Sequence, residues 1–245
     1  MASPDSTLRL RRLANAVRLL LVVQQRAGFL HVYAGITVAT ILIVRLAMPE
    51  SWRPWVVPAV LLSEYGTIGV FMTGAHRYLE RIEGSNVALV VTPLEPREHI
   101  GAMILAPALV ATVAGTVLHA ALIGIDGRLL LLVLPLWLTA VIAGAVGIVL
   151  AAHYSEFTRF LVSTIPVITV FSLPFLSFFG FTPRLAFAWL PWDAALYSYA
   201  NLARPEPVLS VYVLLIIELA AFAALGFSRA ERSYGALSHE AGVAG

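Results

Sequence analysis

Hydrophobic residues in this chain come in long runs that are separated by short polar or charged segments. Six runs approach or exceed twenty residues, at 29–48, 55–74, 100–123, 129–151, 160–179 and 208–227. About twenty apolar residues in a helix cross the hydrocarbon core of a bilayer. The pattern therefore predicts an all-α integral membrane protein with six transmembrane helices in a domain of residues 29–228. Pro166 and Pro174 are expected to kink the fifth helix.

The segment before the first run has helical periodicity but is too polar to cross a membrane. Within residues 8–25, Leu10, Leu13 and Val17 recur on one face, and Arg11 and Arg18 fall on another. Residues 1–28 are thus predicted to form a short tail and an amphipathic helix that lies in the membrane interface. Arginine-rich faces of this kind bind the anionic head groups of membrane lipids.

A charged segment, residues 75–99, separates the second and third runs. Gly84 is expected to end the preceding helix, Ser85 can cap a new one, and Pro93 prevents that helix from continuing. The result is a short, isolated helix with charges at both ends. Such a helix suits docking into a groove on a partner protein.

The residues of this segment carry a family resemblance. Glu80-Arg81-x-Glu83-Gly84-Ser85, followed by Ala88-Leu89-Val90-Val91-Thr92-Pro93-Leu94, resembles the cytoplasmic coupling helix of type-2 (ABC-2 type) ABC transporter permeases. The whole layout is similar to small bacterial drug-efflux permeases of the fluoroquinolone-export type. The resemblance implies that separate ABC ATPase subunits contact Glu80, Arg81, Glu83, Gly84, Ser85, Ala88, Leu89, Thr92 and Pro93.

The same resemblance implies the rest of the assembly. One six-helix unit supplies half of a transport pathway, so a second copy or a related permease is expected, as a homodimer or a heterodimer. ATP and Mg²⁺ would belong to the partner ATPase, and this chain is expected to hold no cofactor.

Composition supports the membrane assignment and excludes several functions. The chain is 60% hydrophobic and 12% charged, with mean hydropathy +0.87, too apolar for a soluble globule. All 16 basic residues are arginine, so a Walker A phosphate loop, which needs lysine, is absent. A net charge of +2 gives no basis for nucleic-acid binding. No zinc-hydrolase or serine-nucleophile motif is present, and no catalytic or metal site is predicted.

Arginines near the ends of the runs predict the orientation. The arginines expected on the cytoplasmic side are Arg9, Arg11, Arg12, Arg18, Arg26, Arg77, Arg81, Arg97, Arg159, Arg229 and Arg232, against Arg45, Arg53, Arg128, Arg184 and Arg204 outside. Positive side chains are concentrated on cytoplasmic loops. Both termini, including the tail 229–245, and the 75–99 loop are therefore expected in the cytoplasm, with the protein in the bacterial cell membrane.

The outer loop of residues 180–207 is rich in aromatic residues, among them Trp189, Trp192 and Tyr197. Asp193 is placed to cap a short helix of residues 194–202. The loop can act as an interfacial anchor. The resemblance implies a pair of short re-entrant helices that cover the pathway as an outer lid.

Two carboxylates fall inside apolar runs, Glu64 in the second and Glu218 in the sixth. A charge there costs roughly 2.5 to 3.5 kcal/mol on insertion scales. Ser63 and Thr67 flank Glu64 and fit two interpretations. The glutamates either recognise a cation or proton in a translocation pathway, or serve packing through hydrogen bonds to neighbouring helices.

The favoured hypothesis is a permease subunit of an ATP-driven exporter of amphipathic drug-like or lipid-like molecules. Three alternatives remain: a proton-coupled carrier that uses Glu64 and Glu218, a membrane-embedded enzyme, and a structural or assembly partner without a pathway of its own.

Overall fold

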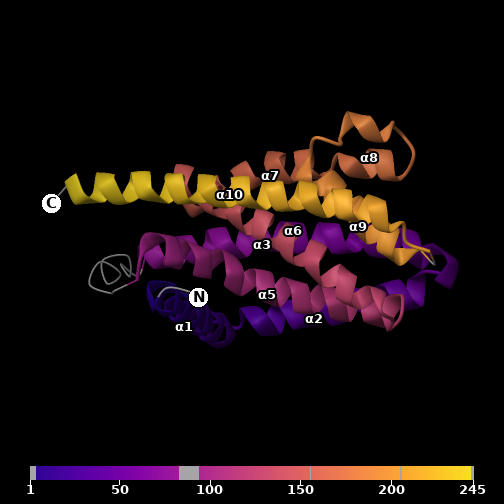
Figure 1. Ribbon diagram of the computed structural model, residues 1–245, viewed down its shortest axis with the longest axis horizontal. Helices are drawn as coiled ribbons and strands as arrows, with labels where there is room; N and C mark the ends of the chain where they lie inside the picture. The colour runs from indigo at the N-terminus through magenta and orange to yellow at the C-terminus, as the bar shows by residue number, and fades with distance from the viewer. Residues whose placement is uncertain (1–3, 83–93, 155, 205, 244–245) are drawn as a thin grey trace.

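The chain folds as a bundle of long helices (Figure 1). A computed structural model describes residues 4–82, 94–154, 156–204 and 206–243. The helices are α1 (Pro4–Arg26), α2 (Phe29–Ala47), α3 (Arg53–Ile82), α5 (Pro96–Leu122), α6 (Arg128–His153), α7 (Phe157–Ser172), α8 (Pro174–Phe178), α9 (Pro191–Ala203) and α10 (Leu209–Val243), with 3-10 turns η1 (Glu50–Trp52) and η2 (Arg184–Ala186). No strand occurs within these residues.

Six helical segments of the described chain are long and apolar enough to cross a bilayer. They are Phe29–Ala47, Glu50–Glu80, Pro96–Leu122, Arg128–His153, Phe157–Phe178 and Leu209–Ser233. The predicted all-α membrane fold with six transmembrane helices is therefore confirmed. The amphipathic segment before them is α1, which is slightly longer than predicted.

Helix α6 is the centre of the bundle and packs against α3, α5, α9 and α10. Small residues let the α3 and α6 backbones touch. A Cβ on Gly147 of α6 would lie 2.4 Å from the carbonyl oxygen of Val70, and one on Gly69 of α3 would lie 2.8 Å from the Ala143 Cβ. Van der Waals packing between such close backbones is what holds helices together in lipid, where burial of apolar surface gives little.

The bundle has two distinct ends (Figure 1). Helix α1, the last turns of α3, the first turn of α5 and the end of α10 lie toward one end, which we call the Glu80 end. The turn η2 and helices α8 and α9 lie toward the other, the Trp192 end.

Arg128 links two connections at the Trp192 end. Its guanidinium pairs with Asp126 and donates a hydrogen bond to the carbonyl oxygen of Arg204. It thereby joins the α5–α6 connection to the α9–α10 connection. The hydrogen bond from Arg128 lowers the pKa of Asp126, so this carboxylate is ionised at neutral pH.

The helix boundaries agree with the sequence-based expectation at α3 and differ from it at α10. Helix α3 continues past Gly74 to Ile82, as expected for a helix that Gly84 ends, so the first third of the 75–99 segment is helical. Helix α10 continues to Val243, so most of the predicted tail 229–245 extends the last helix. In the fifth span, α7 and α8 are separated only by Leu173, whose backbone angles stay helical (φ −56°, ψ −35°), next to Pro174, one of the prolines expected to kink this helix. Proline lacks the N–H that would continue the helical hydrogen bonds, which explains the interruption.

Candidate coupling site and intramembrane polar sites

A buried ion cluster joins the last turns of α3 to the first turn of α5 at the Glu80 end. Glu80 Oε1 lies 3.0 Å from His99 Nε2 of α5, and Glu80 Oε2 lies 3.1 Å from Arg77 Nη1. His76 Nε2 lies 3.6 Å from the same carboxylate. Glu80, Arg77 and His99 are each exposed by only 6–7%. We call Glu80, Arg77, His76 and His99 the Glu80 cluster. It joins α3, which precedes residues 83–93, to α5, which follows them.

A second set of ion pairs connects α1 to the same turn of α5. Arg12 Nη2 lies 3.0 Å from Glu98 Oε1, and Arg9 Nη2 lies 3.4 Å from Glu95 Oε1. Glu95 and Glu98 also form a capping box at the start of α5, in which the Glu95 amide donates to Glu98 Oε2 at 3.0 Å. Reciprocal capping of this kind fixes the first turn of a helix. Helices α1, α3 and α5 are therefore linked through one short stretch of α5.

Helix α10 joins this assembly through an exposed ion pair between Arg97 and Glu231. Arg97 lies between Glu95 and Glu98, the two glutamates that pair with α1, and two residues before His99 of the Glu80 cluster. Four helices thus meet at residues 95–99.

The predicted coupling residues are only partly visible in this geometry. Glu80 lies in the last turns of α3, and its carboxylate pairs with Arg77 of the same helix and with His99 of α5. Arg81 is also in α3, but its side chain is not among those described. The predicted contacts Glu83, Gly84, Ser85, Ala88, Leu89, Thr92 and Pro93 lie outside the described residues.

Glu64 has a polar partner on a neighbouring helix. The hydroxyl of Thr40 on α2 donates a hydrogen bond to Glu64 Oε1 on α3. The adjacent Ser63 donates to the carbonyl oxygen of Ala59 in its own helix, at 2.9 Å. Thr67 lies in α3, and its side chain is not described. A hydroxyl donor stabilises either an ionised or a protonated carboxyl, so both roles considered for Glu64 are compatible with this contact.

Glu218 lies half-buried in α10, and its carboxylate makes no hydrogen bond or ion pair to another described residue.

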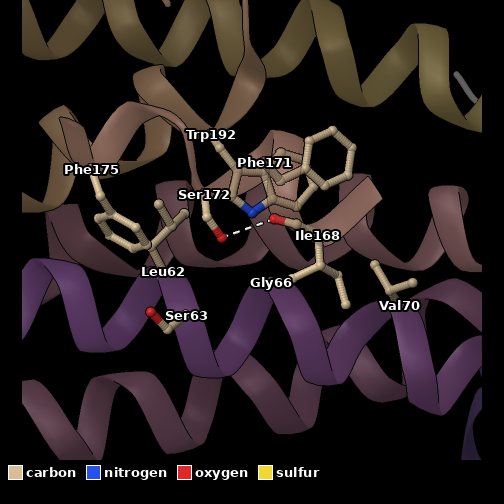
Figure 2. A pocket seen from close by; sticks show the side chains of 9 residues that line it. All are labelled: Leu62, Ser63, Gly66, Val70, Ile168, Phe171, Ser172, Phe175 and Trp192. Carbon is tan, nitrogen blue, oxygen red and sulfur yellow. Dashed lines mark hydrogen bonds between the residues drawn. The ribbon is translucent and has the colours of Figure 1, made fainter. Parts of the chain in front are cut away.

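Aromatic side chains close the bundle at the Trp192 end (Figure 2). The Trp192 ring of α9 stacks on Phe171 of α7, with centroids 3.9 Å apart and an interplanar angle of 9°. Figure 2 shows both rings above Gly66 of α3, where a Cβ would lie 2.7 Å from Trp192 Nε1. The cavity beside them measures about 10 Å³, room for at most one water molecule. Trp192 is thus a packed residue in this conformation.

Asp193 does not cap α9, contrary to the prediction. The helix begins at Pro191 with Leu190 as its N-cap, because proline is favoured in the first turn, and Asp193 falls inside that turn. Its carboxylate instead accepts a hydrogen bond from Arg184 Nε at 3.0 Å. Burial raises the pKa of Asp193, and the Arg184 guanidinium opposes part of that rise.

The other aromatic residues predicted in this loop differ in burial. The Arg184 guanidinium lies 4.1 Å from the centre of the Tyr197 ring, a cation–π contact that holds η2 against α9. Trp189 is 65% exposed and donates to the carbonyl oxygen of Ala186 at 3.0 Å. An exposed tryptophan beside a packed helix fits an interfacial anchor.

Sequence reasoning missed several residues that complete these sites. The spacing of His76 and Arg77 relative to Glu80, four and three residues, places them on one helical face and could have been recognised. His99, Arg12 and the other cross-helix partners carry no such signal, because each comes from a separate helix.

The helical bundle, its apolar spans and its polar ends define a multi-pass membrane protein. Residues 11–229 match the model of the fluoroquinolones export permease protein family, and the chain belongs to this family. It is 33% identical over 180 residues to fluoroquinolones export permease proteins from Mycobacterium tuberculosis strains CDC 1551 / Oshkosh and ATCC 25618 / H37Rv. These alignments cover 71% of this chain and 73% of each relative. The chain is therefore a membrane permease of a drug-export family.

Proposed function

We propose that the chain is the permease subunit of an ATP-driven ABC exporter in the bacterial cell membrane. Its cargo would be an amphipathic drug of the fluoroquinolone type, because the relatives are named as export permeases for these compounds. A separate ABC ATPase would supply the energy, since the lysine-free chain has no Walker A loop. Two ATPase copies and two permeases would form the complete transporter. ATP and Mg²⁺ would bind only to the ATPase.

The Glu80 cluster is the observation that carries the mechanism. Residues 85–91 would dock into the ATPase, and closure of the ATPase would push on the ends of α3 and α5. Glu80 and His99 lie 3.0 Å apart and are buried, so separating the two helix ends would leave buried charged groups without their partners, which is costly. Glu80 would act as a positioning residue that makes α3 and α5 move as one body.

The ion pairs of α5 with α1 and α10 would spread this motion. Arg12–Glu98 brings in the amphipathic helix, and Arg97–Glu231 brings in the last span. A rigid-body movement of these helices against the remaining spans would change the side to which the pathway opens.

Helix α1 would hold the assembly against the membrane surface. Its Arg11 and Arg18 are exposed, in contrast to Arg12, which is paired with Glu98 of α5. Exposed arginines on an interfacial helix attract anionic lipid head groups.

Reconstitution tests the proposed function. Proteoliposomes that contain this permease and its partner ATPase are expected to move ciprofloxacin only when Mg²⁺ and ATP are present on the ATPase side. Collapse of the proton gradient should leave this transport unchanged. Transport by the permease alone that stops with the gradient would instead establish the proton-coupled carrier. Chemical turnover by the purified chain would establish the membrane-embedded enzyme.

A substitution at Glu64 tests whether the carboxylate binds the cationic amine of a drug. Glu64→Gln keeps the hydrogen-bond acceptor for Thr40 but removes the charge. We expect export of ciprofloxacin to fall about tenfold with normal membrane insertion, because hydrogen bonds to charged groups contribute roughly 1.5–3 kcal/mol. Thr40→Val is the control, since it removes the hydroxyl and keeps the carboxylate. Equal export by wild type and Glu64→Gln would leave Glu64 with a packing role only.

A further inference from the structure

An apolar groove runs along α1 and is lined by residues of α1, α5, α6 and α10. Its part nearest the Glu80 end has a volume of about 430 Å³. It continues into a second hollow of about 400 Å³, and both are lined by Leu10, Leu13, Leu105 and Trp137. We call the two together the α1 groove. Volumes of roughly 300–1,000 Å³ are typical of small-molecule sites.

The groove has an aromatic, apolar floor and a charged rim. Trp137 of α6 and Phe227 of α10 line its floor. Arg9, Arg97 and Glu95 line the rim, and all three side chains are exposed, by 60%, 71% and 41% respectively. Charge of both signs therefore lies at one edge of an otherwise apolar cavity.

The charged side chains of the rim have further hydrogen-bond donors and acceptors available for a ligand. Each guanidinium has five N–H donors, and the ion pairs of Arg9 with Glu95 and of Arg97 with Glu231 use only part of them. The remaining donors can bind a carboxylate, the favoured partner of arginine. The exposed carboxylate of Glu95 can accept a hydrogen bond from an ammonium group.

We propose that the α1 groove is an entry site for the exported molecule, an aromatic amphipath that carries both a carboxylate and an ammonium group. This inference rests on the proposed export function and deepens it. The aromatic body would lie against Trp137 and Phe227, and the two charged groups would face the rim. In the proposed orientation the rim faces the cytoplasm, where an exporter collects its cargo.

The position of the groove links its occupancy to the coupling site. Glu95 and Glu98 line the groove, form the capping box of α5 and pair with α1. The next residue, His99, belongs to the Glu80 cluster. A ligand that engages the rim therefore acts on the same helical turn that ties α3 to α5, and cargo binding is expected to stimulate ATP hydrolysis by the partner.

Thiol protection tests the site directly, because the chain contains no cysteine and any introduced one is unique. Leu10→Cys places a thiol in the groove. Leu19→Cys is the matched control on the same helix, with nearly equal exposure, 64% against 65%, but outside the lining. In nanodiscs, saturating ciprofloxacin is expected to slow maleimide labelling at position 10 about tenfold, as for a site at least 90% occupied. Labelling at position 19 should not change.

Three results would overturn the entry site. Labelling at position 10 that ciprofloxacin does not slow would show an empty groove. A disulfide between two Leu10→Cys chains would assign the groove to a second copy of the permease. A phospholipid that copurifies and that ciprofloxacin cannot displace would assign it to the membrane.

A functional measurement separates this inference from the proposed function. Trp137→Ala should raise the ciprofloxacin concentration for half-maximal ATPase stimulation about tenfold, because it removes the ring from the floor. Val113→Ala is the control, on α5, 64% exposed and outside the groove lining. If Trp137→Ala exported the drug normally with ATP and needed the same ciprofloxacin concentration for half-maximal ATPase stimulation, the entry site would be refuted but the export mechanism would stand. Failure of wild type to associate with an ATPase would refute the export mechanism, whatever the labelling result.

Discussion

The Glu80→Ala variant is expected to lose about 3–5 kcal/mol of folding stability and to abolish export. Removal of the carboxylate leaves Arg77, which is 6% exposed, and His99 without the acceptor that joins them. A buried charge whose partner is deleted is far more costly than an intact pair is favourable. Unfolding in mixed detergent, followed by helical circular dichroism, measures the first effect, and transport in proteoliposomes measures the second.

A matched control lies in η1, immediately before α3. Glu50 pairs with Arg53 at 3.0 Å, and its side chain is 86% exposed. Exposed pairs contribute about 0–1 kcal/mol, so Glu50→Ala should unfold almost like wild type. Glu80→Gln should retain part of the stability, because the amide oxygen still accepts a hydrogen bond. Equal stability of Glu80→Ala and Glu50→Ala would contradict the role given to the Glu80 cluster.

The Gly147→Ala variant is expected to separate α3 from α6 and to lower stability by about 1–3 kcal/mol or more, with loss of export. The added Cβ would lie 2.4 Å from the carbonyl oxygen of Val70. That oxygen belongs to the backbone of a packed helix and cannot rotate away as a side chain can. The helices must move apart, and the contacts along the centre of the bundle are lost with them.

Gly35→Ala is the control for this substitution. Gly35 lies in α2 with nothing within 4 Å of the position a Cβ would take. Alanine is favoured over glycine inside a helix by roughly 1 kcal/mol, so the change should be neutral or stabilising. In the same unfolding assay, the stability of Gly147→Ala should therefore fall, and that of Gly35→Ala should stay the same or rise. Destabilisation of both by similar amounts would show that the close approach at Gly147 is not special.

The number and type of the spans could be predicted from sequence because length and hydropathy alone decide whether a helix crosses a bilayer. The end of α3 could be predicted as well, because Gly84 is expected to end that helix and α3 continues to Ile82. The Glu80 cluster could not be predicted, because the charges of His76, Arg77 and Glu80 suit an exposed segment equally well, whereas in the structure they pair with one another. A charge in sequence does not reveal whether its partner is water or a neighbouring side chain.

Contacts between helices that are far apart in the sequence could not be predicted either. Thr40 with Glu64, Phe171 with Trp192, and Glu80 with His99 each join residues from different helices. Periodicity shows which residues share a helical face but not which helix that face meets.

Asp193 illustrates how the same limit misled the prediction for the outer loop. Its local sequence fits an N-cap, but Pro191 starts the helix earlier, and Arg184 provides the aspartate with a partner.

The central proposal is that residues 85–91 dock into a separate ATPase. A single cysteine at Leu89, which lies outside the described residues, can carry a photoactivatable crosslinker in the cysteine-free chain. A cysteine at Leu185 of η2, 87% exposed at the Trp192 end, is the control. We expect irradiation of whole cells to join position 89, and not position 185, to a nucleotide-hydrolysing subunit. Capture of that subunit from position 185 only, or from neither position, would contradict the account.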